Sequence, residues 1–218
     1  MPRDSYRTSE AVLLPMCARL KTISVTENTA EAALVKALYE EAFPEIERIC
    51  FDQLIACART ERAALFAYTD GGAFIGFAFV LLPGPYAYLL FTATAPERRN
   101  RGYGAEILNE LRRVYTGRRL ILDIEQLSDD AENSVERTRR YRFYYNNGFR
   151  DTGFEMRDRT GEYRILSEGG GFDRNGFVES YRILPEIFEE TDIYRVGCAP
   201  PVFRGTEGRV SPDWRKPE

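Results

Sequence analysis

A short stretch rich in arginine and glycine, ERRNRGYGA from Glu97 to Ala105, contains the residue types that most clearly point to chemistry. It follows an apolar run that ends near Thr94, and it precedes a segment with helical periodicity. The first N–H groups of a helix have no intrahelical acceptor and lie at the positive end of the helix dipole. Glycines let a phosphate approach the backbone, and arginines attract it. The stretch therefore predicts a site for a phosphate-bearing ligand, with an ordinary strand-to-helix turn and solvated arginines as the alternative.

Several other chemistries do not fit the sequence. A Walker-type loop requires Gly-x-x-x-x-Gly-Lys followed by Ser or Thr, which the chain lacks, and only three of its 218 residues are lysines. The dinucleotide-binding fingerprint requires a third glycine three residues after Gly104, where Ile107 stands. The chain also contains no histidine. Histidine-based nucleophilic systems and most transition-metal sites are thereby excluded, and we expect no metal.

The elements that must position this loop follow from hydrophobic periodicity. Strands are expected over 23–27, 63–69, 73–82, 87–94 and 120–125, helices over 30–43, 51–59, 103–115, 134–146 and 177–188, and a weaker hairpin over 154–157 and 163–166. The links Asp70-Gly71-Gly72 and Pro83-Gly84-Pro85 are typical of hairpins, so the first half of the sheet should be antiparallel. A strand meander followed by alternating strands and helices predicts an α+β fold.

Length and composition indicate one domain with extensions. The chain is 44% hydrophobic and 13% aromatic, which is enough to fill a core without disulfides or metals. We predict an irregular lead-in over 1–21, the main domain over 22–170, a helical extension over 171–196 and a loose tail over 197–218. The four cysteines form no CxxC pair, and no run approaches 18 apolar residues. With a net charge of −4, we expect a cytoplasmic protein that binds neither membranes nor nucleic acid.

The segment from Arg99 to Gly104 resembles the Arg/Gln-x-x-Gly-x-Gly/Ala motif by which GNAT acetyltransferases hold the pyrophosphate of acetyl-CoA. A second signature of that family, an aliphatic or aromatic residue before Tyr-x-x-x-Gly-Phe at a helix end, resembles the stretch from Phe143 to Phe149. Both motifs occur in the right order and context, within a similarity that spans about residues 22–168. The resemblance implies the GNAT fold, a mixed and mostly antiparallel sheet flanked by helices, in which two splayed strands form the acetyl-CoA cleft.

The same resemblance implies roles for individual residues. Acetyl-CoA would be the cosubstrate, and its acetyl group would pass directly to an amine within a ternary complex. Backbone groups near Ala93 and Thr94 would pair with the pantetheine arm like an added strand. Tyr144 would supply a proton to the departing thiolate. The candidate base is Glu125, acting directly or through water, with a solvated rim carboxylate as the alternative. The pyrophosphate would be held by Arg99, Asn100, Arg101, Gly102, Tyr103, Gly104 and Ala105.

Two positions depart from the family pattern. Arg137 stands where relatives often have an asparagine, and Asn146 stands where they are frequently basic. Two other functions stay open: a non-catalytic acyl-CoA-binding regulatory domain, and an RNA-associated acetyltransferase that uses the arginines of the 134–146 helix. The sequence does not identify the acceptor, which we expect to be a small-molecule or peptide amine, nor whether the acyl group is only acetyl. It also leaves a homodimer open.

Overall fold

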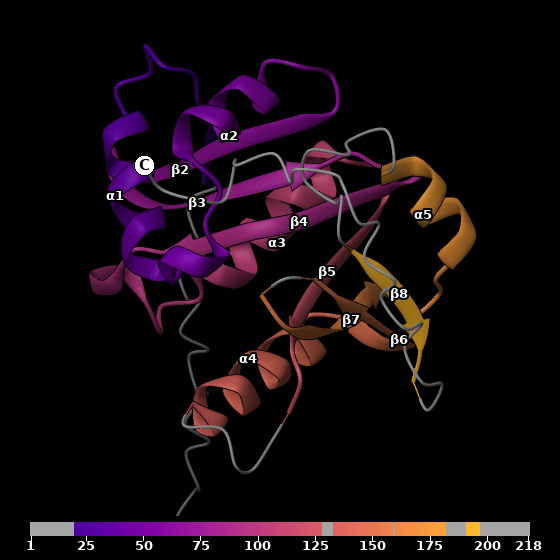
Figure 1. Cartoon of the computed structure of the whole chain (residues 1–218). Coiled ribbons are helices and arrows are strands. Elements are labelled where there is room, and N and C mark those ends of the chain that lie inside the picture. The colour runs from indigo at the N-terminus through magenta and orange to yellow at the C-terminus, as the bar shows by residue number, and fades with distance from the viewer. Residues whose placement is uncertain (1–19, 128–132, 159, 182–190, 197–218) are drawn as a thin grey trace, which may run out of the picture.

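A computed structural model describes residues 20–127, 133–158, 160–181 and 191–196 of the chain (Figure 1). The described strands form one open sheet in the order β1-β2-β3-β4-β5-β7-β6-β8. These strands are β1 (Lys21–Ser24), β2 (Ala63–Asp70), β3 (Ala73–Leu81), β4 (Tyr86–Thr94), β5 (Arg119–Glu125), β6 (Phe149–Arg157), β7 (Glu162–Glu168) and β8 (Asp192–Arg195). The described helices are α1 (Ala32–Ala42), α2 (Phe51–Ala58), α3 (Tyr103–Val114), α4 (Ser134–Asn146) and α5 (Arg174–Tyr181), with the short 3-10 helices η1 (Glu45–Glu47) and η2 (Pro96–Arg98).

Strands β2, β3 and β4 form an antiparallel meander, as expected from the turns between them, and β1 pairs antiparallel with β2 after a connection through α1 and α2. Gly71 and Gly72 both have positive φ, 56° and 84°, which is the backbone that a tight hairpin between β2 and β3 requires. Strand β3 reads AFIGFAFVL, an almost continuous apolar run. Such a run suits a strand that is covered on both faces. The expected α+β fold with a mixed, mostly antiparallel sheet is therefore confirmed.

Different helices cover the two faces of the sheet (Figure 1). One apolar cluster joins α1 and α2 to the sheet through residues such as Val35, Leu38 and Leu54. The other lies beneath α3, whose Ile107, Leu108 and Leu111 are almost completely buried. These α3 residues recur at the three- and four-residue spacing of one helix face, which is the pattern that predicted the helix. The sheet is thus the middle layer of a three-layer domain.

Strands β4 and β5 pair only at their beginnings, over Tyr86↔Arg119, Ala87↔Leu120 and Tyr88↔Ile121. They are parallel neighbours, and beyond the third pair β4 continues to Thr94 and β5 to Glu125 with no further pairing between them. Figure 1 shows the two strands close together near α5 and separating toward their C-terminal ends. The facing edges of both strands are consequently open beyond the pairs. This splay creates the place where a ligand can enter the sheet.

The C-terminal part differs from the prediction of a purely helical extension over 171–196. Helix α5 ends at Tyr181 among the described residues, and the chain later adds β8, which pairs antiparallel with β6 from Phe154↔Arg195 to Arg157↔Asp192. A four-residue strand is too short for its alternation to stand out in the sequence. The expected helix residues 182–190, the rest of the lead-in (1–19) and the tail (197–218) lie outside the described residues.

Helix α5 belongs to the core, because Phe177 is 1% exposed and contacts the rings of Tyr86 and Tyr88 edge-on, with centroids 5.5 and 5.6 Å apart. We expect Phe177→Ala to lower the free energy of unfolding by about 3 kcal/mol, measured by urea denaturation. Asn175→Ala, an exposed position on the same helix, should change it by less than about 0.5 kcal/mol. Equal stability of the two variants would contradict the packing of α5 on β4.

Candidate active site

The point where β4 and β5 separate is bridged by a hydrogen bond between two side chains. Tyr88 is paired with Ile121, and residues two apart on a strand point to the same face, so Asp123 lies diagonally beside Tyr88. The Tyr88 hydroxyl donates a hydrogen bond to Asp123 Oδ1. The Tyr88 oxygen also lies 3.9 Å from the Sδ atom of Met156 on β6. The aspartate is therefore fixed at the base of the splay.

The surroundings of Asp123 disfavour the ionised form of its carboxyl group. Burial raises its pKa to about 7, the hydrogen bond from Tyr88 acts in the opposite direction, and the negative charges of Asp158 and Glu47 raise it further. An ordinary aspartate has a pKa near 3.9. A carboxylate with a pKa near neutrality accepts a proton more readily than an ordinary one, which suits it to general base catalysis at physiological pH.

Glu125, two residues further along β5, is held by cations. Its Oε2 pairs with the guanidinium of Arg140, and its Oε1 accepts a hydrogen bond of 3.1 Å from the Asn133 side chain and lies 3.6 Å from Arg137 Nε. Arg137 also donates to the Gln126 carbonyl at 3.0 Å. The arginine that departs from the family pattern thus helps to anchor the end of β5. Both Glu125 oxygens are engaged, which leaves this carboxylate less suited than Asp123 to accept a proton.

Tyr144 lies on α4 with only 8% of its surface exposed, and its ring contacts that of Phe149 edge-on at 5.7 Å. Burial raises the pKa of its phenol to about 12, while the nearby Arg140 lowers it and Asp123 raises it. The hydroxyl is consequently fully protonated at neutral pH and can act as a donor. The left-handed Gly148, with φ 91°, ends the turn after α4 and directs the chain into β6.

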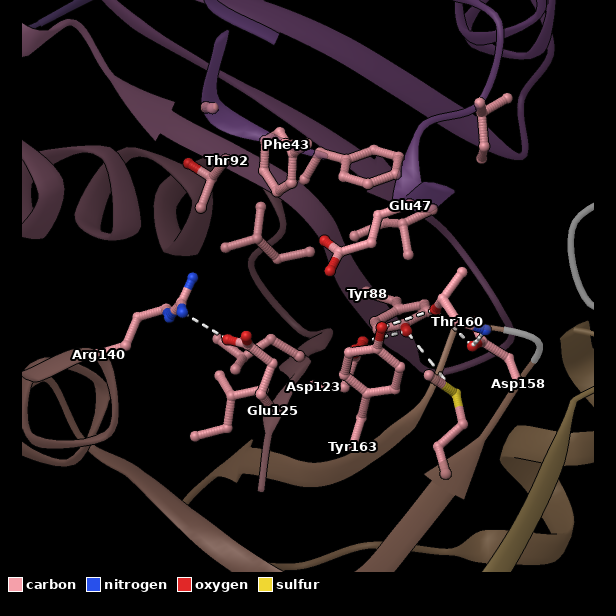
Figure 2. A pocket seen from close by; sticks show the side chains of 18 of the residues that line it. Phe43, Glu47, Tyr88, Thr92, Asp123, Glu125, Arg140, Asp158, Thr160 and Tyr163 are labelled. Atoms are coloured by element: carbon pink, nitrogen blue, oxygen red, sulfur yellow. Dashed lines mark hydrogen bonds and ion pairs between the residues drawn. The ribbon is translucent and has the colours of Figure 1, made fainter. Parts of the chain in front are cut away.

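These side chains line one cavity of about 190 Å³. Tyr88, Asp123, Glu125 and Tyr144 are part of its wall, as are residues of the splayed stretch of β4. Figure 2 shows Asp123 beside Tyr88 and Tyr163, with Glu125 and its partner Arg140 along the same side. Further walls come from η1 through Glu47, from the β6–β7 turn through Asp158 and Thr160, and from β7 through Tyr163.

The arginine–glycine loop connects the end of β4 to α3. Arg99 donates from Nε to the Thr94 carbonyl at 3.1 Å, which draws the loop against the end of the strand. Asn100 and Gly102 have left-handed backbones, with φ 61° and 86°. The amides of Ala105 and Glu106 bond to the Gly102 carbonyl as the first turn of α3. The N–H groups just before them have no carbonyl acceptor within the helix. Together with the exposed Arg101, the loop suits an anion.

Residue 104 lies so close to helix α4 that a glycine suits it best, which the sequence alone does not reveal. A Cβ atom added there would lie 3.1 Å from the ring of Phe143 on α4. The glycine therefore permits α3 and α4 to approach each other, which is a packing requirement separate from phosphate binding. Tyr103, beside it, donates a hydrogen bond of 2.8 Å to Asp70 and so ties the loop to the β2–β3 turn.

The sequence profile of the acetyltransferase (GNAT) family matches residues 32–149, more than half of the chain. The chain belongs to the GNAT acetyltransferase family. Its fold is also that of solved GNAT structures. A GNAT-family acetyltransferase from Bacteroides thetaiotaomicron has a TM-score of 0.59 and 20% identity, and the match covers 78% of this chain and 98% of that one. An acetyltransferase from Thermus thermophilus has a TM-score of 0.52 and 16% identity over 69% and 97% of the two chains.

An aminoglycoside 6′-N-acetyltransferase, solved with coenzyme A, has a TM-score of 0.54 and 16% identity over 67% of this GNAT chain and 95% of its own. No curated protein sequence matches the chain significantly. None of the described helices is long and apolar enough to cross a membrane. At these identities the solved structures establish the shared fold, and the functional residues have to be argued from the GNAT chain itself.

The geometry of this GNAT domain brings together Tyr144 and Glu125, the two catalytic candidates from sequence, as walls of the same cavity. Ala93 and Thr94 lie on the splayed part of β4, and the loop from Arg99 to Ala105 follows directly. Sequence reasoning missed Asp123 and Tyr88. It did place Glu47, with Glu45 and Arg48, where GNAT relatives often shape the acceptor pocket and could select a cationic amine, with a solvated loop as the alternative. One signal was available for Asp123: an acid in the buried strand LILDIE, two residues before Glu125, must point to the same face.

Proposed function

We propose that the protein is an acetyl-CoA-dependent N-acetyltransferase that transfers the acetyl group directly to a primary amine. The observation that carries the proposal is the open edge of β4 at the splay, with a half-buried carboxyl group, Asp123, and a buried phenol, Tyr144, in the wall of the same cavity. The thioester would be held along the edge near Ala93 and Thr94, where main-chain groups are open to an added strand.

The proposed cycle needs three proton transfers, two from the amine nitrogen and one to the sulfur. A lysine-like amine has a pKa of about 10.4 and is charged at pH 7, so it must lose a proton before it attacks the thioester carbonyl. We assign this proton to the carboxylate of Asp123. The new C–N bond forms as the C–S bond breaks, and the departing thiolate takes a proton from the Tyr144 hydroxyl. The nitrogen of the new amide gives its surplus proton to the Tyr144 phenolate, which restores Tyr144, and Asp123 releases its proton to solvent, which leaves an amide and free CoA.

Tyr144 has a raised pKa, which makes it a weaker acid than free phenol. The same dry surroundings also disfavour a thiolate, so the proton affinity of the sulfur rises in parallel. Glu125 is proposed here as a positioning residue: its pairing with Arg140 and Arg137 holds α4 against the end of β5. Arg137 and Arg140 are thereby drawn toward the cavity, and fewer cations of α4 are left for an RNA-binding surface.

The experiment for this proposal is release of free thiol from acetyl-CoA in the presence of a panel of amines. Release that depends on the amine supports an enzyme, whereas CoA binding without release would favour the alternative of a non-catalytic acyl-CoA-binding domain. RNA binding that weakens with salt would favour the RNA-associated alternative.

The phosphate-binding role of the loop has its own test. Arg101→Glu places a negative charge at an exposed position of the loop and should weaken CoA binding by about tenfold, or 1.4 kcal/mol, measured by calorimetry. Lys36→Glu makes the same charge change at an exposed position of α1, on the other face of the sheet, and should leave the affinity unchanged. Equal affinities for both variants would place the phosphates elsewhere.

A further inference from the structure

The cavity contains more carboxylates than the proposed reaction requires. Among the described residues, its charged lining consists of Glu47, Asp123, Glu125, Asp158 and Arg140. Arg140 pairs with Glu125, and Asp123 is assigned to proton transfer. The two remaining acids, Glu47 and Asp158, have no role in the proposed reaction. Asp158 is partly committed to its own turn, because its Oδ1 accepts hydrogen bonds from the amide and hydroxyl of Thr160 at 2.7 and 2.6 Å.

Glu47 is in a different situation, because no hydrogen bond or ion pair to its side chain occurs among the described residues. It is half-buried in η1, and its carboxylate reaches into the cavity from the side opposite β5 (Figure 2). Burial raises its pKa, as do the charges of Glu125 and Asp158, while Arg140 and Arg137 lower it. A carboxylate in such surroundings is destabilised until a cation approaches it.

That cation cannot be the amine that reacts. The reacting nitrogen must be neutral when it attacks, and it ends as an uncharged amide. Several carboxylates around this nitrogen would raise its pKa and hold it protonated, which would slow the reaction. One carboxylate of raised pKa is enough to take its proton. The attraction of Glu47 is useful throughout the reaction only if it acts on a second group that stays charged.

We propose that the acceptor is a small diamine, in which one primary amine is acetylated near Asp123 and Tyr144 while a second ammonium group is held by Glu47. This inference rests on the proposed function and specifies its substrate class. Apolar and aromatic walls support it, because Phe43, Phe91 and Met156 line the same cavity as the charged groups and suit a methylene chain. Phe43 and Tyr88 add rings whose faces attract cations. The volume of about 190 Å³ is below the roughly 300–1,000 Å³ of pockets for drug-sized ligands, which favours a short acceptor.

Three probes with four carbon atoms each separate this inference from its alternatives: 1,4-diaminobutane, butylamine and 4-aminobutanoate. They share the reacting amine, and their fourth carbon carries an ammonium group, is a methyl group or is a carboxylate. We expect kcat/KM by thiol release to fall at least tenfold from the diamine to butylamine, and further to the amino acid because its carboxylate is repelled. Equal values for the diamine and butylamine, with turnover present, would overturn the diamine inference and leave the proposed function intact.

Glu47→Gln should lower kcat/KM for the diamine about tenfold and change that for butylamine by less than threefold. Glu45→Gln alters an exposed acid of the same η1 helix that does not line the cavity, and both amines should react with it as with the parent. Loss of activity toward both amines in Glu47→Gln would assign this residue to the reaction rather than to acceptor selection, and would overturn the inference.

Binding provides a readout that does not depend on turnover. With CoA present, 1,4-diaminobutane should raise the melting temperature of the parent and of Glu45→Gln, but much less that of Glu47→Gln, and butylamine should have little effect on any of them. If no amine releases thiol but this pattern of shifts appears, the cation site stands and the proposed function fails. If the diamine neither reacts nor binds, the diamine inference is overturned, and the proposed function falls with it only if no other amine of the panel releases thiol.

Discussion

Replacing Asp123 with asparagine is expected to lower kcat by two to three orders of magnitude at pH 7.5, because general base catalysis typically contributes 10²- to 10⁴-fold. Asparagine keeps the size of the side chain and an oxygen that accepts the Tyr88 hydrogen bond, so the site should keep its geometry. Affinity for CoA, measured by calorimetry, should change by less than about threefold. Asp151→Asn alters another partly buried strand aspartate outside the cavity and should keep at least half of the parent kcat.

The pH dependence distinguishes a base from a structural carboxyl group. Since the pKa of Asp123 is raised to about 7, kcat/KM of the parent should rise tenfold per pH unit below 7 and level off above it. Asp123→Asn should lose this inflection, with a rate that keeps rising toward pH 10 as solvent supplies the neutral amine. Tyr88→Phe removes a hydrogen bond that lowers the pKa of Asp123, so it should move the inflection to higher pH. An inflection that survives in Asp123→Asn would assign it to another group.

The same carboxyl group links stability to pH. Its pKa is about 7 in the folded protein and near 3.8 when unperturbed, so the folded state binds the proton more tightly than the unfolded state. Its contribution to stability is present below pH 4, is lost as the pH rises to 7, and is constant above. Relative to the parent, Asp123→Asn should gain about 4 kcal/mol between pH 4 and 8, measured by urea unfolding.

The phosphate-binding loop and its two flanking elements could be predicted because their signals are local. Consecutive residues encode the strand end, the glycines and the amphipathic α3 helix, and the structure has α3 over Tyr103–Val114. Helix α4 was likewise predicted with its observed bounds, Ser134–Asn146, although only Tyr144 among its residues is fully buried.

The base of the splay could not be predicted in the same way, because its contacts join distant segments. The hydrogen bond between Tyr88 and Asp123 spans 35 residues and depends on the parallel register of Tyr88 with Ile121. Glu125 was recognised as an acid that faces the site, but its two arginine partners come from α4, and only the packed structure reveals that they occupy it. Glu47 enters the cavity from η1, a single turn with no sequence period of its own.

Tyr144→Phe tests the proton transfer to the sulfur, and we expect kcat to fall about 100-fold, near the lower end for general acid catalysis because water can partly replace the phenol. The substitution keeps the ring, which is buried against Phe149, and removes only the hydroxyl. The proton is needed as the C–S bond breaks, so the effect should appear in kcat and not in ground-state affinity. The Kd for acetyl-CoA should therefore move by less than threefold, under about 0.7 kcal/mol.

Tyr145→Phe is the matched control for this experiment. Tyr145 is the next residue of α4, is 48% exposed and stacks on the guanidinium of Arg150 at 4.1 Å, so loss of its hydroxyl should change neither kcat nor affinity. Both variants should melt at the parent temperature, since neither loses ring packing. A Tyr144→Phe variant with kcat within threefold of the parent, under conditions where chemistry limits thiol release, would remove Tyr144 from the reaction. Weaker acetyl-CoA binding with unchanged kcat would instead make it a residue that packs the cosubstrate, and the proton for the thiolate would then have to come from water in the cavity.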